Sequence, residues 1–261
     1  MVKKLQELQV KTKLLEVADP CNAVTLLTVL TMLTAIIVAA GDSRRMGFDK
    51  LFAVVAGKPI IAHTISAFQR AKSVEGIVVV TREDRHDGIK AIVREEKFEK
   101  VWSIIPGGKH RQDSVQAGMN HLDSGTRWIA VHDAARPLIT PEQIERVFQQ
   151  CTRRGAAALA EPIKDTLKRA GSDLLVSGSV DRDQLYAMQT PQIFERQLIE
   201  EAYRVVYAEN ISVTDEVSAV ERLGRKIALV LNDDFNFKIT YPRDLAVAEY
   251  VLKQRMDSVA N

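Results

Sequence analysis

The sequence has few cysteines and histidines, the residues that form the disulfides of small extracellular folds or bind metals. Its two cysteines, Cys21 and Cys151, lie far apart and match neither a disulfide framework nor the ligand spacing of a zinc site. The five histidines show no ligand spacing either. This cysteine usage is typical of a reducing compartment, so we expect the protein in the cytoplasm.

An excess of either charge is also missing. The 261 residues include 36 basic and 34 acidic side chains, which gives a formal net charge of +2. Nucleic-acid-binding domains usually carry a strong positive field. The charge balance therefore argues against a nucleic-acid partner.

The uncharged stretch from Ala23 to Ala40 has the length of a membrane span, but its pattern argues against one. A helix there would carry a polar stripe, because threonines recur at positions 25, 28, 31 and 34. The end of the stretch is better used as a strand. We expect no membrane segment and a helical extension over residues 1–34 that is dispensable for activity. Met32 would suit a translation start.

Short apolar runs alternate with amphipathic segments after the extension. The pattern predicts strands over 35–40, 76–80, 101–105 and 128–133, and helices over 59–71, 84–97, 114–122 and 141–154. Such alternation predicts an α/β fold with a Rossmann-like, mostly parallel sheet and helices on both faces. Ligands bind such sheets at the carboxyl ends of the strands. The loops after Ala39, Ile105 and Val131 should therefore converge.

The alternation breaks between Glu161 and Phe194, where short alternating pieces predict a protruding β-hairpin arm. An isolated hairpin is marginally stable in water, so we expect the arm over 161–194 to dimerise with a second copy of the chain. Regular structure resumes with helices over 195–208 and 214–223, a strand over 226–231 and a helix from Pro242 to about Arg255. The predicted domain spans residues 35–256.

The first predicted strand runs into "AAGDSRRMGFDK", a loop that suits a polyphosphate. Its small residues, which let a ligand approach the backbone, are Ala39, Ala40 and Gly41. Its cations are Arg44, Arg45 and Lys50. Backbone N–H groups and cations together can hold a polyphosphate and the charge that develops on it during transfer. The loop lacks both the Walker ending and the dinucleotide fingerprint. The alternative is that these cations are solvated loop residues.

Two further loops offer complementary groups. "PGGKHRQDSV" allows backbone groups to reach a base edge, and Arg111 and Ser114 add hydrogen-bonding side chains, although an ordinary turn with Asp113 as a helix cap also explains it. "VHDAARPLI" places Asp133 at the end of a strand. A carboxylate beside a polyphosphate loop is suited to Mg²⁺, so we predict Asp133 as a metal ligand. The alternative role is the capping of a turn.

Seven segments in one order carry a family resemblance. They are "AAGDSRRMG", "GGKHRQDSV", "VHDAARP", "DTLKR", "VDRDQLYAMQTPQ", "TDEVSAVE" and "FKIT". The set resembles the 2-C-methyl-D-erythritol 4-phosphate cytidylyltransferase family of the non-mevalonate isoprenoid pathway, over about Ala35 to Arg255. The resemblance implies a dimeric enzyme that uses Mg²⁺ and transfers CMP from CTP to a polyol phosphate.

The resemblance also implies residue roles. Contacts to the CTP triphosphate are expected from Ala39, Ala40, Gly41, Arg45 and Lys50. Contacts to cytosine are expected from Gly108, Lys109 and Ser114, and Ala134 and Arg136 should lie near the nucleotide or the second substrate. The polyol phosphate is expected to bind Thr166, Arg182, Thr190 and Lys238, with the arm serving the partner's site. Catalytic charge stabilisation is expected from Arg45, Lys50 and Lys238.

The sequence departs from the family pattern in the first loop. Ser43 replaces a common glycine, and the loop from Arg45 to Lys50 is shorter than in some members. Other functions remain as alternatives. They are a ribitol 5-phosphate cytidylyltransferase, a sugar-phosphate nucleotidyltransferase that uses GTP or UTP, and a non-catalytic nucleotide sensor.

Overall fold

The strand β1 (Leu33–Ala39) lies inside the sheet because both of its faces are apolar. Ala35 and Ile37 pack into one core cluster, and Ile36 packs into the other. Such an uninterrupted apolar run is typical of a parallel strand that is covered on both sides. The strand begins at Leu33, two residues before the predicted domain boundary, because Leu33 and Thr34 are also buried.

The computed structural model describes residues 32–43 and 45–260. Of the helical extension predicted over residues 1–34, residues 1–31 lie outside the described residues, and Leu33 and Thr34 belong to β1 and not to a helix. Within the described part, seven strands form one sheet in the order β11 (Ala228–Leu231), β7 (Ala156–Pro162), β10 (Tyr186–Glu195), β6 (Trp128–Asp133), β1, β4 (Val74–Thr81) and β5 (Val101–Pro106). Strand β10 is antiparallel to both neighbours, and the other pairs are parallel. The predicted fold class is confirmed.

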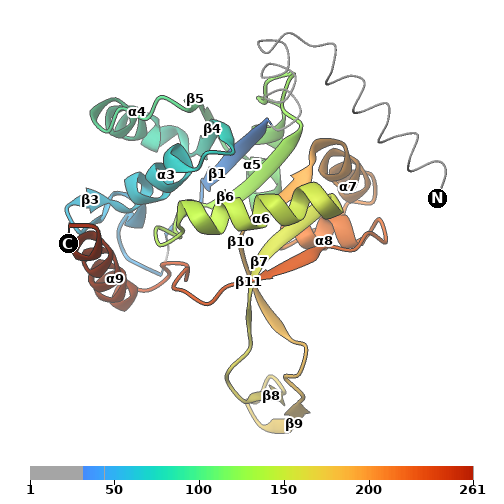
Figure 1. Ribbon diagram of the computed structural model, residues 1–261. Coiled ribbons are helices and arrows are strands. Elements are labelled where there is room, and N and C mark those ends of the chain that lie inside the picture. The colour runs from blue at the N-terminus through green and yellow to red at the C-terminus, as the bar shows by residue number, and fades with distance from the viewer. Residues whose placement is uncertain (1–31, 44, 261) are drawn as a thin grey trace, which may run out of the picture.

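Helices cover both faces of the sheet, as Figure 1 shows. One core cluster joins the sheet to α3 (Ile60–Arg70), α4 (His86–Glu95), α6 (Pro141–Arg154) and α9 (Arg243–Ala260). The other joins it to α5 (Arg111–Met119), α7 (Arg196–Ala208) and α8 (Glu216–Glu221). Smaller elements after β1 are the 3₁₀ turn η1 (Lys50–Phe52) and the short strands β2 (Val54–Val55) and β3 (Lys58–Pro59). A second 3₁₀ turn, η2 (Glu83–Arg85), follows β4.

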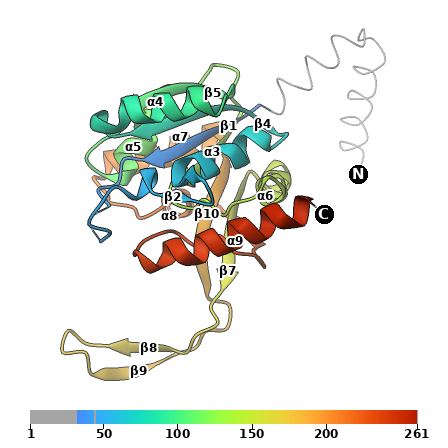
Figure 2. The same cartoon turned by 90° about the vertical axis from the view of Figure 1, so that its left-hand side faces the viewer.

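The arm is shorter than the sequence pattern predicts. Residues 161–162 and 186–194, assigned to the arm, belong to β7 and β10 of the main sheet. They stay in the sheet because Tyr186 and Ala187 pair with Pro162 and Glu161, and because Gln189 to Phe194 are buried. The excursion itself covers residues 163–185 and contains β8 (Leu167–Ala170) and β9 (Val176–Val180), which pair with each other. It projects from the body in both views (Figures 1 and 2).

Several predicted helix boundaries also shift, and the largest shifts are at α5 and α9. Helix α5 begins at Arg111 and not at Ser114, because the backbone N–H of His110 donates to Asp113 and closes the first turn three residues earlier. Asp113 is thus the partner of the cap and not the cap itself. Helix α9 continues past Arg255 to Ala260. Across the residues that the structure describes, no helix has the length and apolar character that a membrane crossing needs.

Candidate active site

Three loops at the carboxyl ends of β1, β5 and β6 meet around one cavity of about 300 Å³. Parallel neighbouring strands end at the same edge, so the loops after Ala39, Pro106 and Asp133 lie together. This confirms the predicted convergence. Nine predicted site residues line the cavity: Ala39, Ala40, Gly41, Lys50, Gly108, Lys109, Ser114, Asp133 and Lys238.

Asp133 is the electrostatic centre of the cavity. Its side chain is 9% exposed, and its carboxylate lies 3.0 Å from the Nζ of Lys238, 3.3 Å from the Nε of Arg111 and 3.5 Å from the Nε of Arg136. Burial raises the pKa of Asp133, but Lys238, Arg111 and Arg136 lower it more, so the pKa lies well below its usual range. Asp133 is therefore ionised at neutral pH.

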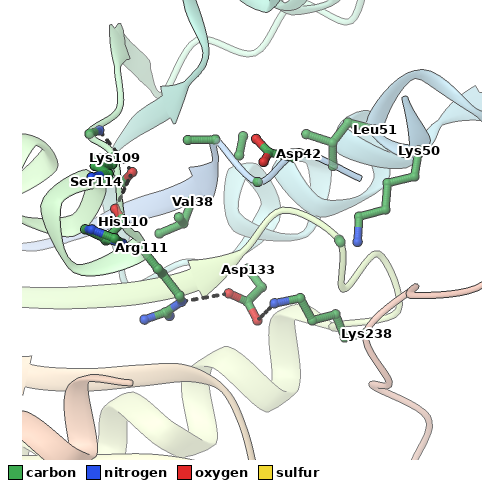
Figure 3. A pocket seen from close by; sticks show the side chains of 15 residues that line it. Val38, Asp42, Lys50, Leu51, Lys109, His110, Arg111, Ser114, Asp133 and Lys238 are labelled. Carbon is green, nitrogen blue, oxygen red and sulfur yellow. Dashed lines mark hydrogen bonds and ion pairs between the residues drawn. The ribbon is translucent and has the colours of Figure 1, made fainter. Parts of the chain in front are cut away.

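Lys50 enters the cavity from η1. Its Nζ donates to the backbone carbonyl of Ile239 at 2.6 Å, which ties the first loop to the segment that carries Lys238. Figure 3 shows Arg111 and Lys238 on opposite sides of Asp133, with the amino group of Lys50 directed toward the same region. Burial and repulsion from Lys238 lower the pKa of Lys50 from 10.5 to about 8. A bound polyanion would favour the charged lysine.

Arg111 is held from behind by a buried carboxylate. Its Nη1 and Nη2 donate to the two oxygens of Glu216 at 2.7 and 3.0 Å, and the hydroxyl of Tyr203 donates to Glu216 at 3.0 Å. Glu216 is fully buried at the start of α8. Such a bidentate ion pair fixes the plane of a guanidinium. Arg111 is therefore positioned to present its Nε to Asp133.

The glycine loop, residues 106–115, lies close to the first loop, residues 39–50. The backbone N–H of Gly107 donates to Thr81, and that of Gly108 donates to the hydroxyl of Ser114 at 3.2 Å. Ser43, in the first loop, has a φ of 55°, in the left-handed region that favours glycine. A glycine would adopt this conformation at a lower cost than the serine does.

Six predicted site residues do not line the cavity. The guanidinium of Arg45 lies over the ring of Tyr241, at 5.5 Å from its centre. The N–H of Ala134 donates to Val38, and Ala135 lines the cavity in its place. Arg136 pairs with Asp133 and donates to the carbonyl of Asn236 at 2.8 Å.

The other three belong to β10 and to the arm. Thr190 is buried in β10, where its hydroxyl accepts from the N–H of Asp133 at 3.1 Å and lies 3.0 Å from His132. Thr166 is exposed on the arm. Arg182 is also exposed there and donates to the carbonyl of Lys164. Neither arm residue lines the cavity.

The sequence patterns missed several residues of the site. Asp42, Leu51 and Ala135 also line the cavity, and Arg85 and Glu216 support it from behind. Glu216 had a signal, because it lies in "TDEVSAVE", one of the seven segments that carry the family resemblance. Arg85 lies in "REDRHD", which is typical of an exposed charged turn, and so had none.

The described residues of the site do not provide enough ligands for a metal ion that is coordinated by protein groups alone. Among the described residues, no group of three or more histidine, cysteine, aspartate or glutamate side chains could hold a metal. Mg²⁺ differs, because it often takes one or two carboxylates and completes its shell with water and phosphate oxygens. The ionised Asp133 fits that requirement.

The same fold and sequence pattern occur in known proteins. Residues 33–254 match the family model described as 2-C-methyl-D-erythritol 4-phosphate cytidylyltransferase. A protein of that name from Dehalococcoides mccartyi (strain CBDB1) is 43% identical over 222 residues, which cover 84% of this chain and 96% of the relative. Another from Pelotomaculum thermopropionicum is 39% identical over 229 residues, 87% of this chain and 96% of the relative.

Solved structures agree with the sequence relatives. The 4-diphosphocytidyl-2C-methyl-D-erythritol synthase of Anaerococcus prevotii has a TM-score of 0.76 and 30% identity, covering 87% of this chain and 98% of its own. Its fold and this cationic cavity are those of a nucleotidyltransferase. Within that class, the chain belongs to the 2-C-methyl-D-erythritol 4-phosphate cytidylyltransferase family.

Proposed function

We propose that this chain transfers CMP from CTP to 2-C-methyl-D-erythritol 4-phosphate, giving 4-diphosphocytidyl-2-C-methyl-D-erythritol and pyrophosphate. The observation that carries the proposal is the meeting of the first loop, the glycine loop, Lys50 and Lys238 around Asp133 in one cavity. The names of the relatives support the same reaction. The cysteine usage favours the cytoplasm as its location.

The reaction depends on positioning and charge neutralisation. A phosphate oxygen of the polyol phosphate attacks the α-phosphorus of CTP, a new P–O bond forms, and the bond to pyrophosphate breaks in line. The attacking phosphate is already ionised at neutral pH, so no general base is required. Lys50 and Lys238 would stabilise charge that grows on the transferring phosphoryl group. Arg45 would join them from its position at Tyr241.

Nucleotide recognition follows from the two small-residue loops. Backbone groups of Ala39, Ala40 and Gly41 would contact the triphosphate, and Gly108, Lys109 and Ser114 would contact the base. Asp133 would hold Mg²⁺, which would neutralise part of the charge on the triphosphate. Lys238, 3.0 Å from Asp133, would contact phosphate oxygens of the substrates.

The arm supports a homodimer with shared sites. Thr166 and Arg182 lie on the arm, away from the cavity of their own protomer, and we assign them to the polyol phosphate bound by the partner. Exposed apolar residues at the arm tip also favour burial against a second copy; they are Leu174, Leu175 and Val176. Arg136 and Thr190 would act from beneath Asp133, as positioning residues.

The test is pyrophosphate release with CTP and Mg²⁺, measured in parallel with methylerythritol phosphate and ribitol 5-phosphate. We expect turnover with the first alcohol phosphate and little with the second. Faster turnover with ribitol 5-phosphate would replace the proposed substrate, and faster turnover with GTP or UTP would replace the nucleotide. CTP binding without any pyrophosphate release would indicate a sensor. Lys72→Ala, which removes an exposed lysine outside the cavity, should release pyrophosphate at the parent rate.

A further inference from the structure

Arg85 is a charged residue in a buried place. It ends η2, after β4, and is 2% exposed. Its Nη1 donates to the carbonyl of Ala39 at 2.6 Å and to that of Gly41 at 2.9 Å, and its Nε donates to the carboxylate of Asp49. A buried guanidinium is costly unless its donors are satisfied, and these three acceptors all belong to the first loop or its borders.

The contacts of Arg85 join both ends of that loop. Ala39 ends β1 at the start of the loop, and Asp49 immediately precedes Lys50 at its end. The second oxygen of Asp49 accepts from the N–H of Leu51 at 3.2 Å and so caps η1, the turn that begins with Lys50. One planar group therefore determines where the loop leaves the sheet and where the turn bearing Lys50 begins.

We propose that Arg85 is a positioning residue for the transfer reaction, holding Lys50 where it can stabilise the transferring phosphoryl group. The proposal rests on the proposed function, because it assigns Lys50 to that charge. Arg85 does not line the cavity, so it acts through the loop and not on a substrate. A lysine could not replace it fully, since an ammonium group lacks the rigid fork that spans several acceptors.

The experiment is a double-mutant cycle between Arg85→Met and Lys50→Met, read out as pyrophosphate release. We expect Arg85→Met to lower kcat about 10- to 100-fold, because misplacing a catalytic group by about 1 Å has an effect of that order. The KM of the polyol phosphate should change little. In the double variant, kcat should be close to that of Lys50→Met alone, because both changes remove the same contribution.

A purely structural role predicts different results. It would lower the number of CTP-binding sites per chain, measured by calorimetry, and leave kcat per occupied site unchanged. The two single variants' losses in pyrophosphate release per total chain would then multiply in the double variant. Either result would overturn the proposal, as would an unchanged kcat in Arg85→Met. Arg94→Met, at an exposed arginine on α4, is the control and should behave as the parent does. Arg85→Lys should recover part of kcat.

If Arg85→Met fails to fold, Asp49→Asn tests the same connection from its more exposed end. The Asp49 side chain is 30% exposed, and the amide keeps its size while removing the charge that pairs with Arg85. We expect a smaller loss of kcat than in Arg85→Met, which again does not multiply with Lys50→Met. A multiplying loss would overturn the proposal here too. Failure of the proposed function is distinguishable, because the parent protein would then release no pyrophosphate.

Discussion

The protein disfavours the charged form of Lys50, and a bound anion would favour it. Burial lowers its pKa most, and the nearby Lys238 lowers it further, to about 8 from 10.5, although Asp133 acts in the opposite direction. A cationic group in that state gains more from a bound triphosphate than a solvated lysine would. In the proposed reaction, Lys50 would therefore lower the stability of the fold and gain interaction energy with the substrate, as is common for active-site residues.

Replacing Lys50 should affect turnover more than CTP binding. We expect Lys50→Met to lower kcat by about 10²- to 10³-fold, because a donor aimed at developing charge acts chiefly in the transition state. CTP affinity, measured by calorimetry, should fall much less. An unchanged kcat would contradict the role given to Lys50.

The pH profile should report the same lysine. A cation with a pKa of about 8 is charged below that pH and loses its charge above it. We therefore expect kcat/KM for CTP, which reports the free enzyme, to fall above about pH 8. Lys50→Arg keeps the charge at higher pH, so its residual activity should not show this decline. The same decline in Lys50→Arg would assign it to another group.

Lys50 should also lower the stability of the fold at neutral pH. Its folded-state pKa lies below the unfolded value, so the unfolded chain binds more protons between about pH 8 and 10.5, and stability should rise with pH across that window. We expect Lys50→Met to raise the free energy of unfolding by about 1 kcal/mol at pH 7, less than the full pKa shift corresponds to, because Lys50 is partly exposed and solvent screens its charge. The gain should disappear above pH 10.5, and Lys72→Met should show none. A destabilised Lys50→Met at pH 7 would contradict this reasoning.

The residues that sequence patterns could predict share one property. Asp133 is the last residue of β6 and Lys50 lies at the end of the loop that follows β1, and parallel strands bring their carboxyl ends together at one edge of the sheet. The supporting contacts do not follow that rule, since Arg85 meets Asp49 across 36 positions and Arg111 meets Glu216 across 105. Their pairing depends on how the loops pack, which no local pattern contains.

At the scale of elements, the cavity depends on close contact between the first loop and the glycine loop. A methyl group on Gly107 would lie 2.7 Å from the Cβ of Ala40 and 2.7 Å from the Oγ of Ser114. No real Cβ contacts are that short, so the two loops would have to separate. Glycine is required here because the side chains of Ala40 and Ser114 lie close to its backbone, and its φ is ordinary.

We expect Gly107→Ala to weaken CTP binding about tenfold, as overpacking commonly costs about 1–3 kcal/mol and both displaced loops are assigned to the nucleotide. Calorimetric titration with CTP would measure it. The control is Gly125→Ala, where a methyl group would lie 3.1 Å from the flexible end of Met32. Unchanged CTP affinity in Gly107→Ala would show that the loops are free to move apart.

At the scale of the whole molecule, one protomer separates residues that the proposed reaction needs together. The arm extends away from the sheet in both views, with Thr166 before β8 and Arg182 after β9 (Figures 1 and 2). Leu174 at its tip is 84% exposed. A two-fold dimer would cover the tip and bring each arm to the partner's cavity.

This arrangement can be tested by restoring activity from two inactive variants, Lys50→Met and Arg182→Ala. The chains are unfolded, mixed in equal amounts and refolded together. Random pairing makes about half of the dimers mixed. If the arm acts on the partner, each mixed dimer has one site with both residues intact and one with neither.

About a quarter of the parent activity should therefore return, since half of the dimers then carry one working site in two. If the arm acts on its own protomer, every site in the mixed dimers lacks one residue, and refolding together restores nothing. Pyrophosphate release measures the recovery, and differently tagged chains verify that mixed dimers form. Recovery no greater than that of either variant refolded alone, with mixed dimers present, would exclude the shared site.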